Sequence, residues 1–270
     1  MKQYLIYENP YAAVKVSKNT KFQLHRLDIS KSDVGPFLTS FSPFVVKLEC
    51  YLRMFNVPYE VLVERPSFNQ APRGKLPYVS VGDTKLTDSD LVISYLKKTQ
   101  GNPDADLDAT QRALGHLVQR ALGDHLYWVI IYYEFFDQNG WDILLKANVG
   151  DPSTLSLEAQ VALAEIREDF RKRCYDQGIA RYLPHEIFDK ACKDLDAVSD
   201  ILGDNRYLLG NDHPTSFDAV LLGFMQAIFQ VRNMHPDITD YARSIPKLGR
   251  YMQNMTAAYF PELRLAFEPT

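Results

Sequence analysis

Two short segments combine residue types that suit binding of a small charged molecule. Asp88-Ser89-Asp90 follows an expected β-hairpin and directly precedes the amphipathic run 91–96, so these residues are expected to open a helix. The free N–H groups and the dipole at a helix start attract a carboxylate, and a neighbouring aspartate suits an ammonium group. Asp88 and Ser89 are therefore candidates for binding a molecule with both charges, and they are also common helix caps.

The exact start of each candidate helix matters for this interpretation. Thr87 and Asp90 have capping-box spacing, while Asp88 is a rival cap, so more than one register is possible. Ser42-Pro43 combines an N-cap residue type with an N1 proline in front of an expected helix over 44–55. A hydroxyl group is thereby expected at a second helix start.

The elements around these residues alternate between strand and helix patterns. The hairpin forms around Gly82-Asp83, which supplies turn chemistry. This order predicts an α/β module with a small mixed sheet of about four strands. The expected strands cover 22–27, 58–63, 76–81 and 85–87.

After residues 101–104 the pattern becomes entirely helical. Thr215 and Asp218 have capping-box spacing and precede the apolar run 219–229. The chain is therefore predicted to consist of an extension over 1–20, an α/β module over 21–101 and an all-helical module over 105–265. The other expected helices cover 108–136, 156–176, 185–202 and 247–259.

Composition narrows the class of protein. A formal net charge of −4 and a pI near 5.9 argue against binding to nucleic acid or an anionic membrane surface. Three widely spaced cysteines without a CxxC pair indicate a reducing compartment, hence a cytoplasmic location, and no zinc site. We expect no metal site, because the histidines do not have the spacing of metal ligands. We also expect no signal peptide or membrane span, because the apolar runs are too short.

Four motifs together resemble the signatures of the glutathione transferase superfamily, in the family's order and at about its separations. Within it, the run 42–54 and the segments around 178–182, 194–195 and 202–204 resemble the failed-axon-connections branch, which is related to the metaxins. The four motifs are Ser42-Pro43-Phe44, Gly74-Lys75-Leu76-Pro77, Asp88-Ser89 and Pro214-Thr215-Ser216-Phe217-Asp218-Ala219.

The resemblance implies a thioredoxin-like domain followed by a helical domain, with glutathione in the cleft between them. Leu76 would pair its backbone with the cysteinyl part of the tripeptide, beside a cis bond before Pro77. Asp88 and Ser89 would bind the γ-glutamyl end. Arg65 and Lys75 are expected to meet the glycyl carboxylate.

Ser42 is the expected catalytic residue, of the serine type. Its hydroxyl and the helix dipole would favour the thiolate form of the glutathione sulfur. Ser40 and Thr39 are rivals, because the loop before this helix is longer than in the family. Cys50 is expected to be a small core residue.

The resemblance implies a detoxifying transferase that conjugates glutathione to an apolar electrophile, and a homodimer. Its acceptor pocket would use one or two of the aromatic residues at the end of the long helix. The alternative is a non-catalytic glutathione-transferase-like binding module, as in the metaxins. Thiol reductase chemistry is disfavoured, because Ser42 stands where such relatives carry cysteine. The six aromatic residues are Tyr127, Trp128, Tyr132, Tyr133, Phe135 and Phe136.

Overall fold

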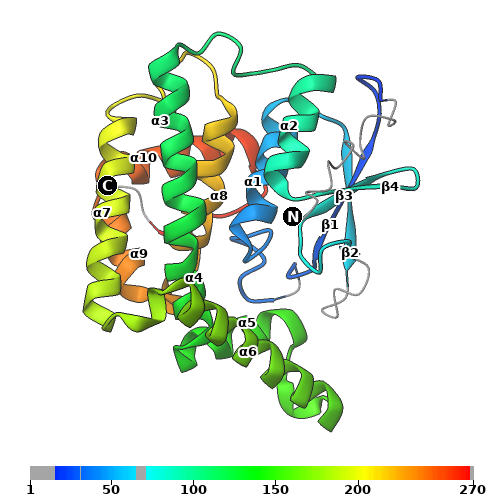
Figure 1. The fold of residues 1–270 in the computed structure, drawn as a ribbon, viewed down its shortest axis with the longest axis vertical. Coiled ribbons are helices and arrows are strands. Elements are labelled where there is room, and N and C mark those ends of the chain that lie inside the picture. The colour runs from blue at the N-terminus through cyan, green and yellow to red at the C-terminus, as the bar shows by residue number, and fades with distance from the viewer. Residues whose placement is uncertain (1–15, 31, 65–70, 268–270) are drawn as a thin grey trace, which may run out of the picture.

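A four-stranded mixed sheet forms the first module of the chain (Figure 1). A computed structural model describes residues 16–30, 32–64 and 71–267. The strands are β1 (Phe22–Leu27), β2 (Tyr59–Glu64), β3 (Tyr78–Val81) and β4 (Thr84–Thr87). Their order is β2-β1-β3-β4; β1 and β2 are parallel, and the other neighbours are antiparallel. The sequence of the extension over 1–20 also allows a short strand at Tyr4–Tyr7, which lies outside the described residues.

Two helices lie between this sheet and the rest of the molecule (Figure 1). Helix α1 (Pro43–Met54) provides the crossover that a parallel β1–β2 pair requires, and ten of its residues are buried. Helix α2 (Ser89–Thr99) follows β4 directly. Both helix starts singled out by the sequence therefore face the boundary between the two modules.

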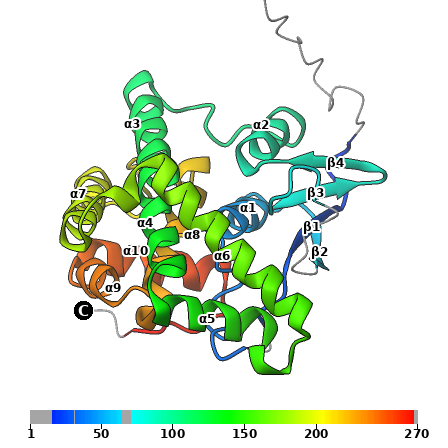
Figure 2. The ribbon, with the colours of Figure 1, turned by 60° about the horizontal axis from the view of Figure 1, so that its bottom comes forward.

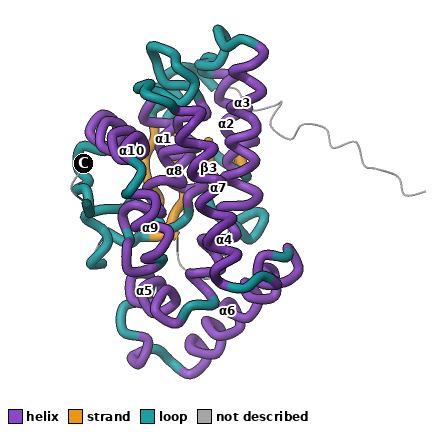
Figure 3. Tube along the Cα trace, turned by 90° about the vertical axis from the view of Figure 1, so that its left-hand side faces the viewer, coloured by secondary structure: helices purple, strands orange, loops and turns teal. Residues whose placement is uncertain are grey.

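The second module contains helices only, within the described part of the chain. Helix α8 lies at its centre, where all its residues are buried, and packs against α1, α3, α9 and α10 (Figure 2). Helices α5 and α6 lie together at one end (Figure 3). The helices are α3 (Ala109–Arg120), α4 (Tyr127–Phe135), α5 (Gln138–Val149), α6 (Leu157–Gln177), α7 (Pro184–Leu202), α8 (Ser216–Gln230), α9 (Pro236–Arg243) and α10 (Pro246–Tyr259).

The start of α8 has the predicted capping box. The Asp218 carboxylate accepts hydrogen bonds from the Thr215 backbone N–H at 2.8 Å and its hydroxyl at 2.9 Å. It also accepts one from the Leu208 N–H at 2.8 Å, which ties the preceding loop to the helix. Because unpaired buried polar groups are costly, these bonds define where the central helix begins.

The predictions for the second module were incomplete. The expected helix over 108–136 contains a π-helical turn, Ala121–Leu126, between α3 and α4. Helices α5 and α9 were not predicted. Asp137, which caps α5 by accepting from the Gly140 N–H at 2.9 Å, and Pro236 at the start of α9 were the available signals. None of the helices in the described ranges has both the length and the apolar character needed to cross a membrane.

Candidate functional site

The start of α1 presents a hydroxyl group that is not used for capping. Ser42 occupies the N-cap position, yet its side chain makes no capping hydrogen bond. Its backbone N–H donates instead to the Ser40 hydroxyl at 3.2 Å. Ser40 and Thr39 are both buried, whereas Ser42 is half-buried. Of the three candidate hydroxyls, that of Ser42 is therefore the most accessible at the positive end of the helix.

The segment before β3 has the expected backbone geometry. The peptide bond between Leu76 and Pro77 is cis, as the resemblance to the family implies. Leu76 is half-buried and Pro77 is buried, while Lys75 is exposed. Arg65, the other expected partner of a carboxylate, lies outside the described residues.

At the start of α2, the structure selects one of the two registers. Asp88 is the N-cap, and its Oδ1 atom accepts from the Asp90 N–H at 3.0 Å and the Leu91 N–H at 3.3 Å. Asp88 has a φ of 70°, a left-handed conformation that non-glycine residues rarely adopt. Thr87 ends β4, and Ser89 is the buried first residue of the helix. Asp88 thus caps the helix through Oδ1, and its second carboxylate oxygen takes no part in these two hydrogen bonds.

A small cavity of about 190 Å³ lies at the module boundary beside this turn. Asp88 is the predicted site residue that lines it, whereas Ser42, Leu76, Pro77 and Ser89 do not. One side of the cavity is apolar and consists of Phe44, Val220 and Phe224. The rest of the lining, the charged side, consists of Lys47, Asp88, Asp90, Arg120 and Asp124, with Gln119 and Gly123.

The charged side is held together by a network that the sequence analysis missed. The Lys47 ammonium, only 2% exposed, donates to the Asp90 carboxylate. Asp90 also accepts from Gln119 Nε2 at 2.7 Å and Arg120 Nη2 at 3.3 Å. Burial lowers the pKa of Lys47, and the Asp90 charge opposes that shift. The only sequence signal was a lysine within the apolar run 44–48.

Of the six predicted aromatic residues, Phe135 is buried in the core, and the other five are half-buried and pack against it. Phe135 stacks on the half-buried Phe170 of α6 with ring centroids 4.2 Å apart. Tyr127 differs, because its ring lies 4.8 Å from that of Phe44, a cavity-lining residue. Cys50 is fully buried, in agreement with its predicted core role. Within the described part of the chain, no cluster of residues suited to a metal ion is present.

Family models match both modules. The glutathione S-transferase N-terminal domain matches residues 43–140, and the glutathione S-transferase C-terminal domain matches residues 191–255. With the thioredoxin-like sheet, the helical module and the cleft between them, these matches define the class. The chain belongs to the glutathione S-transferase family.

The relatives include a glutathione transferase on one side, and Failed axon connections and a metaxin on the other. The isoprene-epoxide–glutathione S-transferase of Rhodococcus sp. (strain AD45) is 30% identical over 231 residues, covering 82% of this chain and 94% of the relative. Failed axon connections of Drosophila melanogaster is 24% identical over 259 residues, covering 90% of this chain and 62% of the relative. Human metaxin-2 is 20% identical over 223 residues, covering 80% of this chain and 81% of the relative.

Solved structures show the same fold. The beta-etherase LigF from Sphingobium sp. strain SYK-6 superposes with a TM-score of 0.56 at 16% identity, covering 89% of this chain and 98% of that one. A glutathione S-transferase of Ceriporiopsis subvermispora in complex with glutathione gives a TM-score of 0.57 at 14% identity, covering 92% of this chain and 99% of that one. At these identities the likeness concerns the fold alone.

Proposed function

We propose that this protein is a glutathione transferase in which Ser42 stabilises the glutathione thiolate. The observation that carries this proposal is the Ser42 hydroxyl, which is at the N-cap of α1 yet makes no capping bond. A hydroxyl donor at the positive end of a helix stabilises a nearby anion, so the thiol pKa falls and the reactive fraction rises. Ser42 would be the catalytic residue, and the glutathione sulfur would be the nucleophile.

The remaining contacts with glutathione follow the order of the elements. The Leu76 backbone, next to Pro77, would pair with the cysteinyl part of the tripeptide. Ser89 at the start of α2 would bind the γ-glutamyl carboxylate, and the second oxygen of Asp88 would bind its ammonium. Lys75 is exposed and free to reach the glycyl carboxylate, a role we also propose for Arg65.

The apolar wall of Phe44, Val220 and Phe224 supports a small, largely apolar electrophile. The isoprene-epoxide transferase among the relatives supports an epoxide as the first compound to test. In such a reaction the thiol proton passes to solvent and the sulfur attacks an epoxide carbon. The carbon–oxygen bond breaks, and the alkoxide takes a proton from water. Detoxification of such compounds is the role we propose.

Three further properties belong to this proposal: the location, the oligomeric state and the module boundaries. A cytoplasmic location is supported by three free cysteines, which suit a reducing compartment. A homodimer is supported by Leu91 on α2 and Leu117 on α3, whose exposed fractions are 43% and 61%. We propose module boundaries of 21–101 and 105–265.

The second candidate function is a glutathione-transferase-like binding module without catalysis. It is favoured by the similarity to Failed axon connections and metaxin-2. It also accounts for the charged side of the cleft, where Asp90 and Asp124 balance the charges of Lys47 and Arg120 without a ligand. Both candidates share the fold, so only binding and turnover measurements separate them.

The test begins with glutathione binding by calorimetry and turnover of a short-chain epoxide and a chloronitroarene. The transferase proposal predicts binding at millimolar glutathione or below, and turnover that Ser42→Ala reduces by roughly a hundredfold. Ser40→Ala is the matched control, because Ser40 is buried in the same loop and should retain most of the rate. Failure of the wild-type chain to bind glutathione would favour the binding module instead.

A further inference from the structure

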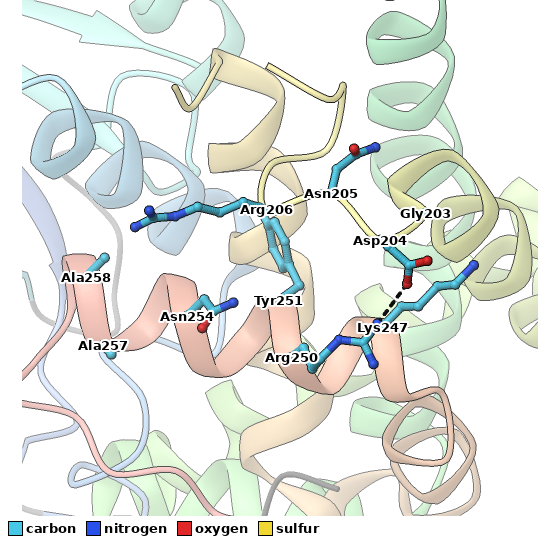
Figure 4. A pocket seen from close by; sticks show the side chains of 10 residues that line it. All are labelled: Gly203, Asp204, Asn205, Arg206, Lys247, Arg250, Tyr251, Asn254, Ala257 and Ala258. Atoms are coloured by element: carbon cyan, nitrogen blue, oxygen red, sulfur yellow. Dashed lines mark hydrogen bonds and ion pairs between the residues drawn. The ribbon is translucent and has the colours of Figure 1, made fainter. Parts of the chain in front are cut away.

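A second and larger hollow lies on the helical module, away from the cleft. It has a volume of about 630 Å³ and is formed by one face of α10 and the turn 203–206 after α7 (Figure 4). It shares no lining residue with the cleft cavity. We call it the α10 groove, defined by residues 203–206 and the α10 residues that line it: Lys247, Arg250, Tyr251, Asn254, Ala257 and Ala258.

The α10 groove is elongated because its lining follows the helical repeat. The lining residues recur every three or four positions from Lys247 to Ala258, which places them along one face of the helix. At 1.5 Å of rise per residue this face is about 16 Å long. An extended peptide of about five residues has the same length.

The groove is cationic although the chain as a whole carries a net charge of −4. Arg206, Lys247 and Arg250 line it, against one carboxylate, that of Asp204. Arg206 and Lys247 have no carboxylate partner within the described part of the chain. In Figure 4, the Arg206 side chain extends along α10 in the direction of Ala258, whereas Lys247 lies at the opposite end. Positive charge is thus spread over the length of the groove.

The single ion pair inside the groove is easily replaced. Arg250 Nη2 lies 3.0 Å from Asp204 Oδ1, and the two side chains are 49% and 86% exposed. Exposed pairs of this kind contribute little stability. A carboxylate on a ligand would form the same bond with Arg250, and bidentate geometry would strengthen it.

The rest of the groove favours a peptide over a compact anion. Ala257 and Ala258 are small and exposed, so a second chain is able to approach the helix closely. Asn254 is exposed between the two charged ends, and its carboxamide offers both a donor and an acceptor to a peptide backbone. A single phosphate would meet only one end of this surface.

We propose that the α10 groove binds an extended, acidic peptide segment of a partner protein. Carboxylates three to five residues apart would pair with Arg206 at one end and with Lys247 and Arg250 at the other. The intervening backbone would lie over Asn254. Electrostatic complementarity would govern both recognition and association rate. This function is independent of glutathione binding in the cleft.

The experiment measures fluorescence anisotropy of a labelled peptide of alternating Glu and Ala, added to the full chain at low ionic strength. Its counterpart with Gln in place of Glu tests the need for charge. We expect binding of the Glu peptide only, weakened by salt and by about tenfold or more in the double variant Arg206→Glu, Lys247→Glu. Circular dichroism verifies that the variant is folded.

The control is Lys98→Glu with Lys172→Glu, which makes the same change of charge on α2 and α6, outside the groove. It should retain most of the affinity. The proposal is overturned if the wild-type chain does not bind the Glu peptide or if the control variant loses as much affinity as the groove variant. Equal binding of the Gln peptide, or displacement by millimolar inorganic phosphate, would also overturn it.

Discussion

The ammonium group of Lys47 on α1 is paired with the carboxylate of Asp90 at the start of α2, although 43 residues separate them in the chain. Gln119 and Arg120 at the end of α3 donate to the same carboxylate. A single acidic side chain therefore joins the two helix starts of the sheet module to the helical module. This junction lies next to Asp88, the cap that borders the cleft.

Asp90→Asn should destabilise the fold by about 2 kcal/mol, because Lys47 would keep a buried charge without its acidic partner. Urea unfolding measures the change. Asp124→Asn is the matched control, since Asp124 is 62% exposed and pairs with Arg120 at 3.1 Å; it should change stability by less than about 0.5 kcal/mol. Equal stability of the two variants would show that the network does not join the modules.

Gly223→Ala should destabilise the packing of α8 against α1 by about 1–3 kcal/mol. A Cβ atom at this position would lie 2.7 Å from the Lys47 backbone nitrogen and 2.8 Å from the Pro43 carbonyl oxygen. Neither backbone atom moves without shifting the start of α1, so turnover should fall as well.

Gly249→Ala on α10 provides the comparison for this change. Apart from its chain neighbours and the adjacent backbone of α10, no heavy atom lies within 4 Å of a Cβ built there, and helical alanine is favoured over glycine by about 0.5–1 kcal/mol. Thermal unfolding should therefore show opposite shifts for the two variants. A Gly223→Ala protein as stable as wild type would contradict the close approach of α1 and α8.

Ser42→Cys should form a mixed disulfide with oxidised glutathione if the side chain at this position faces the sulfur. Intact-protein mass spectrometry detects the adduct, and dithiothreitol should remove it. The wild-type chain is a control with little background, since Cys50 and Cys174 are buried and burial raises the pKa of Cys192 to about 11. An adduct on a Ser40→Cys variant instead would assign the role to the rival hydroxyl.

The free energy of unfolding should fall as the pH rises, because the buried Glu134 on α4 must then lose its proton. Burial raises its pKa from 4.5 to about 8, so the folded chain holds a proton that the unfolded chain releases above pH 4.5. The stability due to this proton is fully present below pH 4.5 and is lost as the pH rises to 8.

Glu134→Gln removes this dependence while preserving the shape of the side chain. The free energy of unfolding of the variant, relative to wild type, should increase by on the order of 4 kcal/mol between pH 4.5 and pH 8. Urea titrations at several pH values measure it. A constant difference between the two proteins over this range would contradict the prediction.

The sequence by itself determined the features that depend on local chemistry. Ser42-Pro43, Asp88-Ser89 and the Thr215–Asp218 box mark helix starts because capping involves residues only two or three positions apart. The sheet followed from short β-branched runs and a glycine turn. Helix α5 was missed because its only local signals are the cap at Asp137 and a weakly periodic sequence.

Only the tertiary structure decided which side chains are free and which are paired. Ser42 has the sequence of a cap but makes no capping bond, whereas Asp88 does cap its helix and Asp90 turns to Lys47, Gln119 and Arg120 instead. Those partners come from distant elements, so their meeting depends on how α1, α2 and α3 pack. Local propensities do not contain that information, because burial and charge pairing arise only when the modules come together.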